Sequence, residues 1–278
     1  MLTDLLIKQY LDKKCNQYIS ILFESFLLTL LAVFLSQLLY YKESGIVSLF
    51  FLSIMLQQRM KDILEENRTG IYEKELNPFR VNSKTSLQII TIFAGIFIAY
   101  FAMTMILPKD LNSYLFKKQL SIAQIDVCDV MKANFGNFHN LVSHNLIILY
   151  LVIMFSFFFQ HIGSIFVLGI NASVWGAVLS IIGQNTAQQY FLNNLVFFIG
   201  ASVSILPHLI LEAGGYVIGS LGGIFISIAC MKYEIGSTGF NRVVGASIRL
   251  SAIAVIIIFI AAYIEAHLPE LIVGYLLS

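Results

Sequence analysis

The sequence has few charged residues. Asp, Glu, Lys and Arg make up 12% of its 278 residues, about half the share found in an ordinary soluble domain. Hydrophobic residues make up 58%. A chain with so little polar material cannot cover a soluble globule, so a soluble enzyme is excluded, and a polytopic membrane protein is the class that fits.

Other features are scarce as well. Cys15, Cys128 and Cys230 lie far apart with no CxxC pair, which argues against a disulfide framework and a cysteine metal centre. The net charge of +1 gives no basic field for nucleic acid. Walker A, GxGxxG, GxSxG and HExxH motifs are absent. We therefore predict no catalytic residue, metal ligand, cofactor or nucleic-acid partner, although these absences do not exclude an enzyme.

The apolar segments predict an all-α transmembrane bundle, since a spanning helix needs about 20 apolar residues. We expect about seven spans, with a tight turn at residues 160–163 and a re-entrant or half-helix segment before Pro207. Residues 2–18 are amphipathic and predict an interfacial helix, with a soluble stub as the alternative. The expected spans lie near 19–41, 45–58, 86–107, 143–159, 161–182, 208–229 and 246–267.

The polar stretches divide the chain. Residues 1–85 would hold the amphipathic helix, two spans and a charged cytoplasmic loop, and 86–278 a transmembrane domain. The second span can continue as helix beyond residue 58, and the polar insert 109–142 can form a surface helix. Lys and Arg concentrate in 59–84 and 232–249, which predicts a multi-pass protein of the cell membrane with its N-terminus in the cytoplasm.

Ionisable residues inside spans are the first place to look for function, because each costs roughly 2.5–3.5 kcal/mol to insert. His208 and Glu212 stand four residues apart and share a helix face. Glu265 should lie at the same depth on the next, antiparallel helix. We therefore predict an intramembrane polar cluster of His208, Glu212 and Glu265.

Small residues continue the same helix face. Gly215, Gly219, Gly222 and Gly223 form a ladder that allows another helix to approach closely. Asn145 and Asn171 are the notable amides within spans, and interhelical hydrogen bonds are expected for them. All six residues are predicted to serve helix packing.

Three roles remain open for the polar cluster. It could hold the helical hairpin together, since buried acids commonly neutralise or pair. It could form a proton or cation site in a transporter, beside a break at Pro207. It could also hold a metal for intramembrane catalysis, although HxxxE alone is a weak signature.

Two segments resemble the stage II sporulation protein M family. Residues 205–223, Ile-Leu-Pro-His-Leu-Ile-Leu-Glu followed by the glycines, resemble its Pro-His-Gly…Glu segment. Residues 261–266 resemble its closing Ala-Ala-Phe-Ile-Glu-Ala segment, and Asn145 and Asn171 resemble its earlier Asn-containing segments. The resemblance covers roughly residues 86–270.

The resemblance implies an integral membrane protein. The sporulation member of the family is a membrane component of an engulfment assembly that includes cell-wall hydrolases. We therefore expect a non-enzymatic scaffold or component of a membrane complex, surrounded by the lipid bilayer and bound to protein partners or to further copies of itself. A small-solute or ion transporter is the alternative, and an intramembrane metalloenzyme ranks third.

Overall fold

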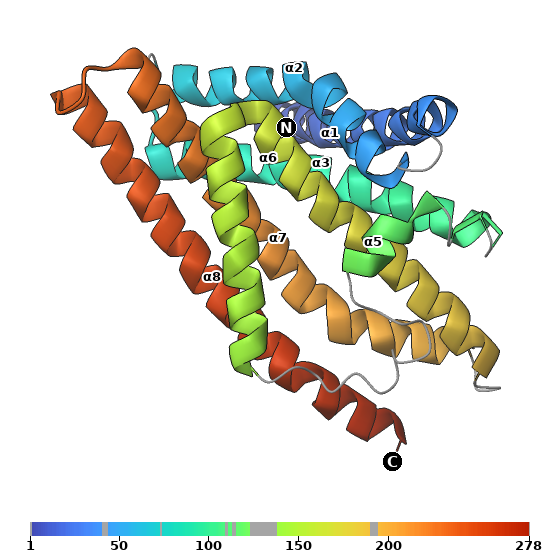
Figure 1. Cartoon of the computed structure of the whole chain (residues 1–278). Coiled ribbons are helices and arrows are strands. Elements are labelled where there is room, and N and C mark those ends of the chain that lie inside the picture. Colours follow the sequence, from blue (N-terminus) through green and yellow to red (C-terminus); the bar gives the residue numbers. More distant parts are fainter. Residues whose placement is uncertain are drawn as a thin grey trace.

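Every regular element that the computed structural model describes is an α-helix, which confirms the all-α class. The structure describes residues 2–40, 44–72, 74–108, 111–112, 115–122, 138–189 and 194–277. The helices α1, α2 and α3 lie side by side, and α6, α7 and α8 run obliquely to them (Figure 1). The helices are α1 (Leu2–Leu39), α2 (Ser44–Tyr72), α3 (Pro78–Ile106), α5 (Lys117–Ile122), α6 (Phe138–Gln189), α7 (Asn194–Lys232) and α8 (Thr238–Leu277).

Five of these helices are long and apolar enough to cross a membrane, as a multi-pass membrane protein requires. They are Asn16–Leu39, Pro78–Ile106, Phe138–Ser180, Ile205–Lys232 and Thr238–Leu268. The predicted second span is not among them, because the apolar part of α2 gives way to polar and charged residues from Gln57 onward. The count of seven spans therefore stays a prediction.

The turn expected within α6 is confirmed. Gln160 has φ 49° and ψ −122°, which interrupts the helix, and the chain folds back there so that α6 has two arms (Figure 1). A Cβ atom at Gly163 would collide with the carbonyl oxygen of Phe155. Only glycine fits at this position, since the second arm starts directly against the end of the first.

The N-terminal helices are longer than we predicted. No helix boundary separates the expected interfacial segment 2–18 from the first span, because α1 is continuous. The expected continuation of the second span as helix is confirmed, and α2 runs on to Tyr72. The rest of the segment expected as a charged loop is mostly helical as well, since α3 begins at Pro78. Charged side chains alternate there with buried apolar ones such as Met60 and Ile63, which is the pattern of an amphipathic helix.

The predicted half-helix before Pro207 is not found. Helix α7 passes through Pro207 without interruption, although residues 190–193 lie outside the described part of the chain. Proline removes one backbone hydrogen bond, and neighbouring helices in a membrane bundle make such a loss tolerable. Pro269 lies within α8 in the same way.

The polar insert after α3 begins by folding back onto α2. The side-chain amide of Asn112 donates to the carbonyl oxygens of Thr104 and Leu107, at 2.7 and 3.0 Å, and so caps the end of α3. Gln119 donates to the carbonyl oxygen of Gly45 at 2.9 Å. The described helix here is α5 alone, and residues 123–137 of the predicted surface helix lie outside the described part.

Helix α7 forms the centre of the bundle. It packs between α6 and α8, and α6 also contacts α2 and α3. Within the most apolar window of α7, 67% of residues are buried, against 17% for α8. The helix that carries His208 and Glu212 is therefore the most enclosed of the five candidate spans, whereas α8, which carries Glu265, is peripheral.

Candidate functional site

Polar side chains meet where α6, α7 and α8 come together. Glu212 of α7 is 2% exposed, and the amide nitrogen Nδ2 of Asn145 on α6 donates a hydrogen bond to its Oε1 at 2.6 Å. The hydroxyl of Tyr216, one turn along α7, donates to Oδ1 of Asn145 at 3.3 Å. Asn145 therefore joins α6 to α7 through both atoms of its amide.

Helix α8 adds a second acid to this site. The carboxyl group of Glu265 lies close enough to that of Glu212 for the two to interact electrostatically. Because an ionised carboxylate only accepts hydrogen bonds, a bond between two carboxyl groups needs a proton on one of them. Chemically, the arrangement can hold one shared proton without a basic partner. We call Asn145, Glu212, Tyr216 and Glu265 the carboxyl cluster.

His208 has a different environment. It is buried on α7, and its ring lies 6.0 Å from that of Trp175 on α6 in an edge-to-face arrangement. Among the residues that the structure describes, no three His, Cys, Asp or Glu side chains form a group able to hold a metal ion. The structure thus brings together two of the three residues predicted for the polar cluster, and it places the histidine against an aromatic ring.

Asn171 also lies apart from the carboxyl cluster. Its Nδ2 donates to the carbonyl oxygen of Val167 at 2.9 Å, four residues earlier in the same helix. The two amides singled out from the sequence therefore differ, because Asn145 bonds across helices and Asn171 bonds within α6.

The glycine ladder faces two neighbours. A Cβ atom at Gly215 would lie 3.0 Å from Ile258, and one at Gly222 would lie 2.8 Å from the hydroxyl of Ser251, both on α8. The other two glycines pack against the first arm of α6. There a Cβ at Gly219 would lie 2.5 Å from Leu149, and one at Gly223 would collide with the carbonyl oxygen of Ile153.

These contacts explain how the carboxyl cluster forms. Gly222 lies beside Ser251, and Gly215 lies beside Ile258, so α7 and α8 run antiparallel with residue numbers changing in opposite directions. This register carries Glu212 and Glu265 to the same level. Close approach at the glycines helps to bury Glu212, whose carboxyl group accepts a hydrogen bond from Asn145.

Tyr216 is the functional residue that sequence reasoning missed. It is 1% exposed, and it follows Glu212 by four residues, so helical spacing alone places both on one face. The sequence prediction treated Tyr216 as an apolar residue and did not consider hydrogen bonding by its hydroxyl. The role of Asn145 carried no comparable local signal, because its partner lies 67 residues away.

A second charged contact lies outside this site. The guanidinium group of Arg59 on α2 forms an ion pair with Glu24 on α1, and its Nε donates to Oε2 at 2.7 Å. Both side chains are about one third exposed. Glu24 thus has a basic partner, whereas the partners described for Glu212 are Asn145 and Glu265.

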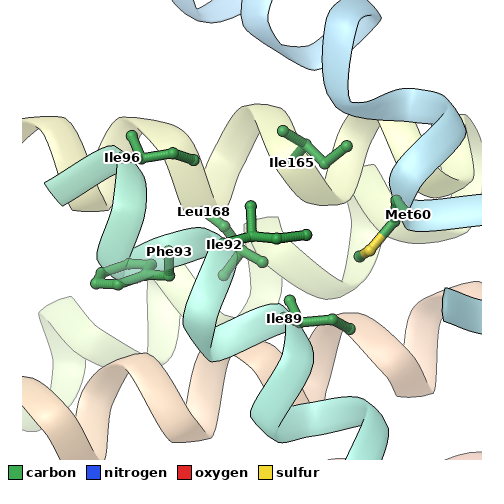
Figure 2. A pocket seen from close by; sticks show the side chains of 7 residues that line it. All are labelled: Met60, Ile89, Ile92, Phe93, Ile96, Ile165 and Leu168. Atoms are coloured by element: carbon green, nitrogen blue, oxygen red, sulfur yellow. The ribbon is translucent and has the colours of Figure 1, made fainter. Parts of the chain in front are cut away.

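A small cavity lies between α2, α3 and α6 (Figure 2). Its volume is about 10 Å³, close to the minimum for a single water molecule. A space of this size with an apolar lining cannot accept a solute. It is lined by Met60, Ile89, Ile92, Phe93, Ile96, Ile165 and Leu168.

Comparison with known proteins supports the resemblance noted in the sequence. The family model described as stage II sporulation protein M matches residues 88–268, which include all of the carboxyl cluster and the glycine ladder. No curated protein and no solved structure matches the chain. Because the family model covers more than half of the chain, this membrane protein belongs to the stage II sporulation protein M family.

Proposed function

We propose that this chain is a non-enzymatic membrane component that organises a protein complex, and that the carboxyl cluster fixes how its helices pack. The observation that carries the proposal is the 2.6 Å hydrogen bond from Asn145 to Glu212. Because this hydrogen bond joins two buried side chains of the same chain, both groups bond to the protein itself. The cluster then stabilises one packing of the helices.

The surrounding contacts support this role. Three helices contribute to the carboxyl cluster, and the glycines of α7 hold α6 and α8 close beside it. Interhelical hydrogen bonds and small residues are the main specific contacts between helices in lipid, where hydrophobic burial gives little preference. A fixed three-helix unit can present its connecting segments to partners in a constant arrangement.

Transport is the second candidate, and one observation favours it. The carboxyl groups of Glu212 and Glu265 are close enough to interact electrostatically, and such a pair can take up and release a proton. In a transporter this step would be coupled to the movement of a solute or ion. An intramembrane metalloenzyme is not proposed, since the described residues bring together no suitable set of ligands.

Copurification separates the two candidates. Wild type, Glu212→Gln and the matched control Glu65→Gln, whose acid is exposed on α2, would be purified gently from native membranes and analysed by mass spectrometry. We expect wild type and the control to retain one reproducible set of partners. Glu212→Gln should lose part of this set together with folded yield, because the altered cluster no longer fixes α7 against α8.

Two outcomes would contradict the scaffold role. In the first, wild type elutes alone under conditions in which the protein remains folded. In the second, Glu212→Gln folds and keeps every partner but abolishes proton-coupled flux in proteoliposomes, which would assign the cluster to transport.

We also infer that the N-terminus and the turn between α7 and α8 face the cytoplasm. Gln160 donates to the hydroxyl of Ser227 at 3.2 Å and to the sulfur of Met231 at 3.4 Å, so the α6 turn lies at the lysine-bearing end of α7. Basic residues favour the cytoplasmic side.

In a cysteine-free background, Lys74→Cys should react with a membrane-impermeant maleimide only after cells are opened. Labelling of intact cells would reverse the orientation.

A further inference from the structure

The outer face of α8 carries two arginines near one end. Arg242 and Arg249 are seven residues apart, so they lie on the same side of the helix, about 10 Å apart along its axis. Both side chains are exposed, and both lie inside the segment Thr238–Leu268 that can span a membrane. Charged residues at such positions are costly unless a partner is present.

No carboxylate in the described part of the chain supplies that partner. The described ion pairs join Glu24, Glu65 and Glu66 to bases on α2 and α3, none of them on α8. The neighbouring helices α6 and α7 turn their side chains toward the opposite face of α8, which carries Ala254 and Ile258. The two guanidinium groups therefore point out of the protein.

The side chain of Arg249 bends toward Arg242. Its Nη1 atom lies 3.9 Å from the position of a Cβ atom at Gly245, one turn nearer the start of α8. The absence of a side chain at Gly245 lets the guanidinium group lie along the helix. Arginines that extend from an apolar span toward the headgroup region take this direction.

Beyond the arginines, the same stripe becomes apolar. Ile253, Ile256 and Ile260 follow at helical spacing, and each is more than 40% exposed. The face thus begins with two cationic groups and continues with branched aliphatic side chains. This sequence of cationic and then aliphatic side chains along the helix matches an amphiphile that has an anionic head and hydrocarbon chains.

The turn before α8 has the composition of a membrane interface. Lys232 adds a third cation, Tyr233 an amphipathic ring, and Ile235 a side chain that is 84% exposed. Glu234 is the single acid of this turn and is also exposed. Aromatic and basic residues gather at headgroup level in membrane proteins, so this end of α8 lies where lipid phosphates are found.

We propose that the outer face of α8 binds an anionic phospholipid, with Arg242 and Arg249 on the phosphate and the isoleucines along the acyl chains. Arginine suits this ligand, because its planar guanidinium group donates two parallel hydrogen bonds to phosphate oxygens. The headgroup must carry net negative charge, since a zwitterionic headgroup would set a cation of its own against the arginines. The proposal is independent of the role assigned to the carboxyl cluster.

Native mass spectrometry of the delipidated protein tests this inference. The protein would be titrated with phosphatidylglycerol or with phosphatidylcholine of identical chains. Wild type should bind phosphatidylglycerol in preference. The double variant Arg242→Gln/Arg249→Gln should weaken that binding about thirtyfold, the effect expected for the loss of two basic groups from an anionic surface.

The matched control is Lys74→Gln/Arg80→Gln, which removes the same charge from exposed positions in the connection between α2 and α3 and in the first turn of α3. It should leave the lipid preference unchanged. If the glutamine pair fails to fold, Arg242→Lys/Arg249→Lys decides, because lysine keeps the charge but lacks the planar fork and should bind phosphatidylglycerol more weakly than arginine does.

Any one of three results would overturn the assignment. They are equal binding of the two lipids by wild type, an unchanged preference in the folded arginine variants, and displacement of phosphatidylglycerol by inorganic phosphate. The last result would show that a free anion suffices and that the isoleucines contribute nothing.

Discussion

Two interfaces in this protein join their helices through different kinds of polar contact. Between α2 and α3, Nδ2 of Asn67 donates to Asn82 at 2.9 Å and to Thr85 at 2.8 Å. Beside them, Nζ of Lys84 contacts Glu66 at 2.5 Å. This interface combines amides, a hydroxyl and a pair of opposite charges, and its ion pair is partly exposed.

The carboxyl cluster has two acids and no base. Glu212 is almost fully enclosed, and its described partners are Asn145 and Glu265. Water can replace a lost partner at the α2–α3 ion pair, but not at Glu212. The comparison shows that the free energy lost on removing one partner of a polar contact depends on whether water can reach the partner that remains.

The largest effect should come from Asn145→Leu. The change keeps a similar volume but removes the amide that donates to Glu212, so a buried carboxyl group loses its partner. We expect a loss of about 3 kcal/mol in the free energy of unfolding. Thermal unfolding in detergent, followed by circular dichroism, would measure it against wild type.

Asn171→Leu is the matched control for this change. Asn171 is also buried on α6, but its side chain bonds to the backbone of its own helix. Its replacement should cost about 1 kcal/mol or less. Equal losses in the free energy of unfolding for the two variants would mean that the hydrogen bond to Glu212 contributes no more to stability than the bond of Asn171 within α6. The proposed difference between the two interfaces would then be wrong.

Helical periodicity and apolar length predicted much of the fold. They gave the all-α class, the turn near Gln160 and the common level of Glu212 and Glu265, because each depends on residue spacing along a helix. The charged run 59–84 misled the prediction. Its charges suggested a loop, whereas buried residues such as Ile63 and Val81 hold it in two packed helices.

The spacing of residues along α7 could not predict which neighbouring helix each of them contacts. The glycines of α7 form one stripe in projection, yet Gly215 and Gly222 contact α8 while Gly219 and Gly223 contact α6. Helical geometry says which residues share a face, and it does not say how many helices meet that face. Asn145 became part of the site for the same reason, since its partner depends on the packing of helices distant in sequence.

The smallest effect should come from Lys84→Ala at the partly exposed ion pair between α2 and α3. Exposed ion pairs contribute at most about 1 kcal/mol and weaken with salt. Burial raises the pKa of Glu66, but hydrogen bonds from Lys84 and Gln88 and the nearby lysine charges outweigh it, so the pKa is lowered. Stability from this pair is therefore present above the ordinary glutamate pKa of 4.5 and is lost as pH falls through the lower folded value.

Unfolding of wild type and Lys84→Ala would be compared at neutral pH and at a pH well below 4.5, each at low and high salt. The two proteins should differ at neutral pH and low salt and should converge when acid protonates Glu66 or when salt screens the pair. A difference that persists in acid would show that Lys84 stabilises the α2–α3 interface through the packing of its hydrocarbon stem, and this interface would then resemble the carboxyl cluster more closely than its charges suggest.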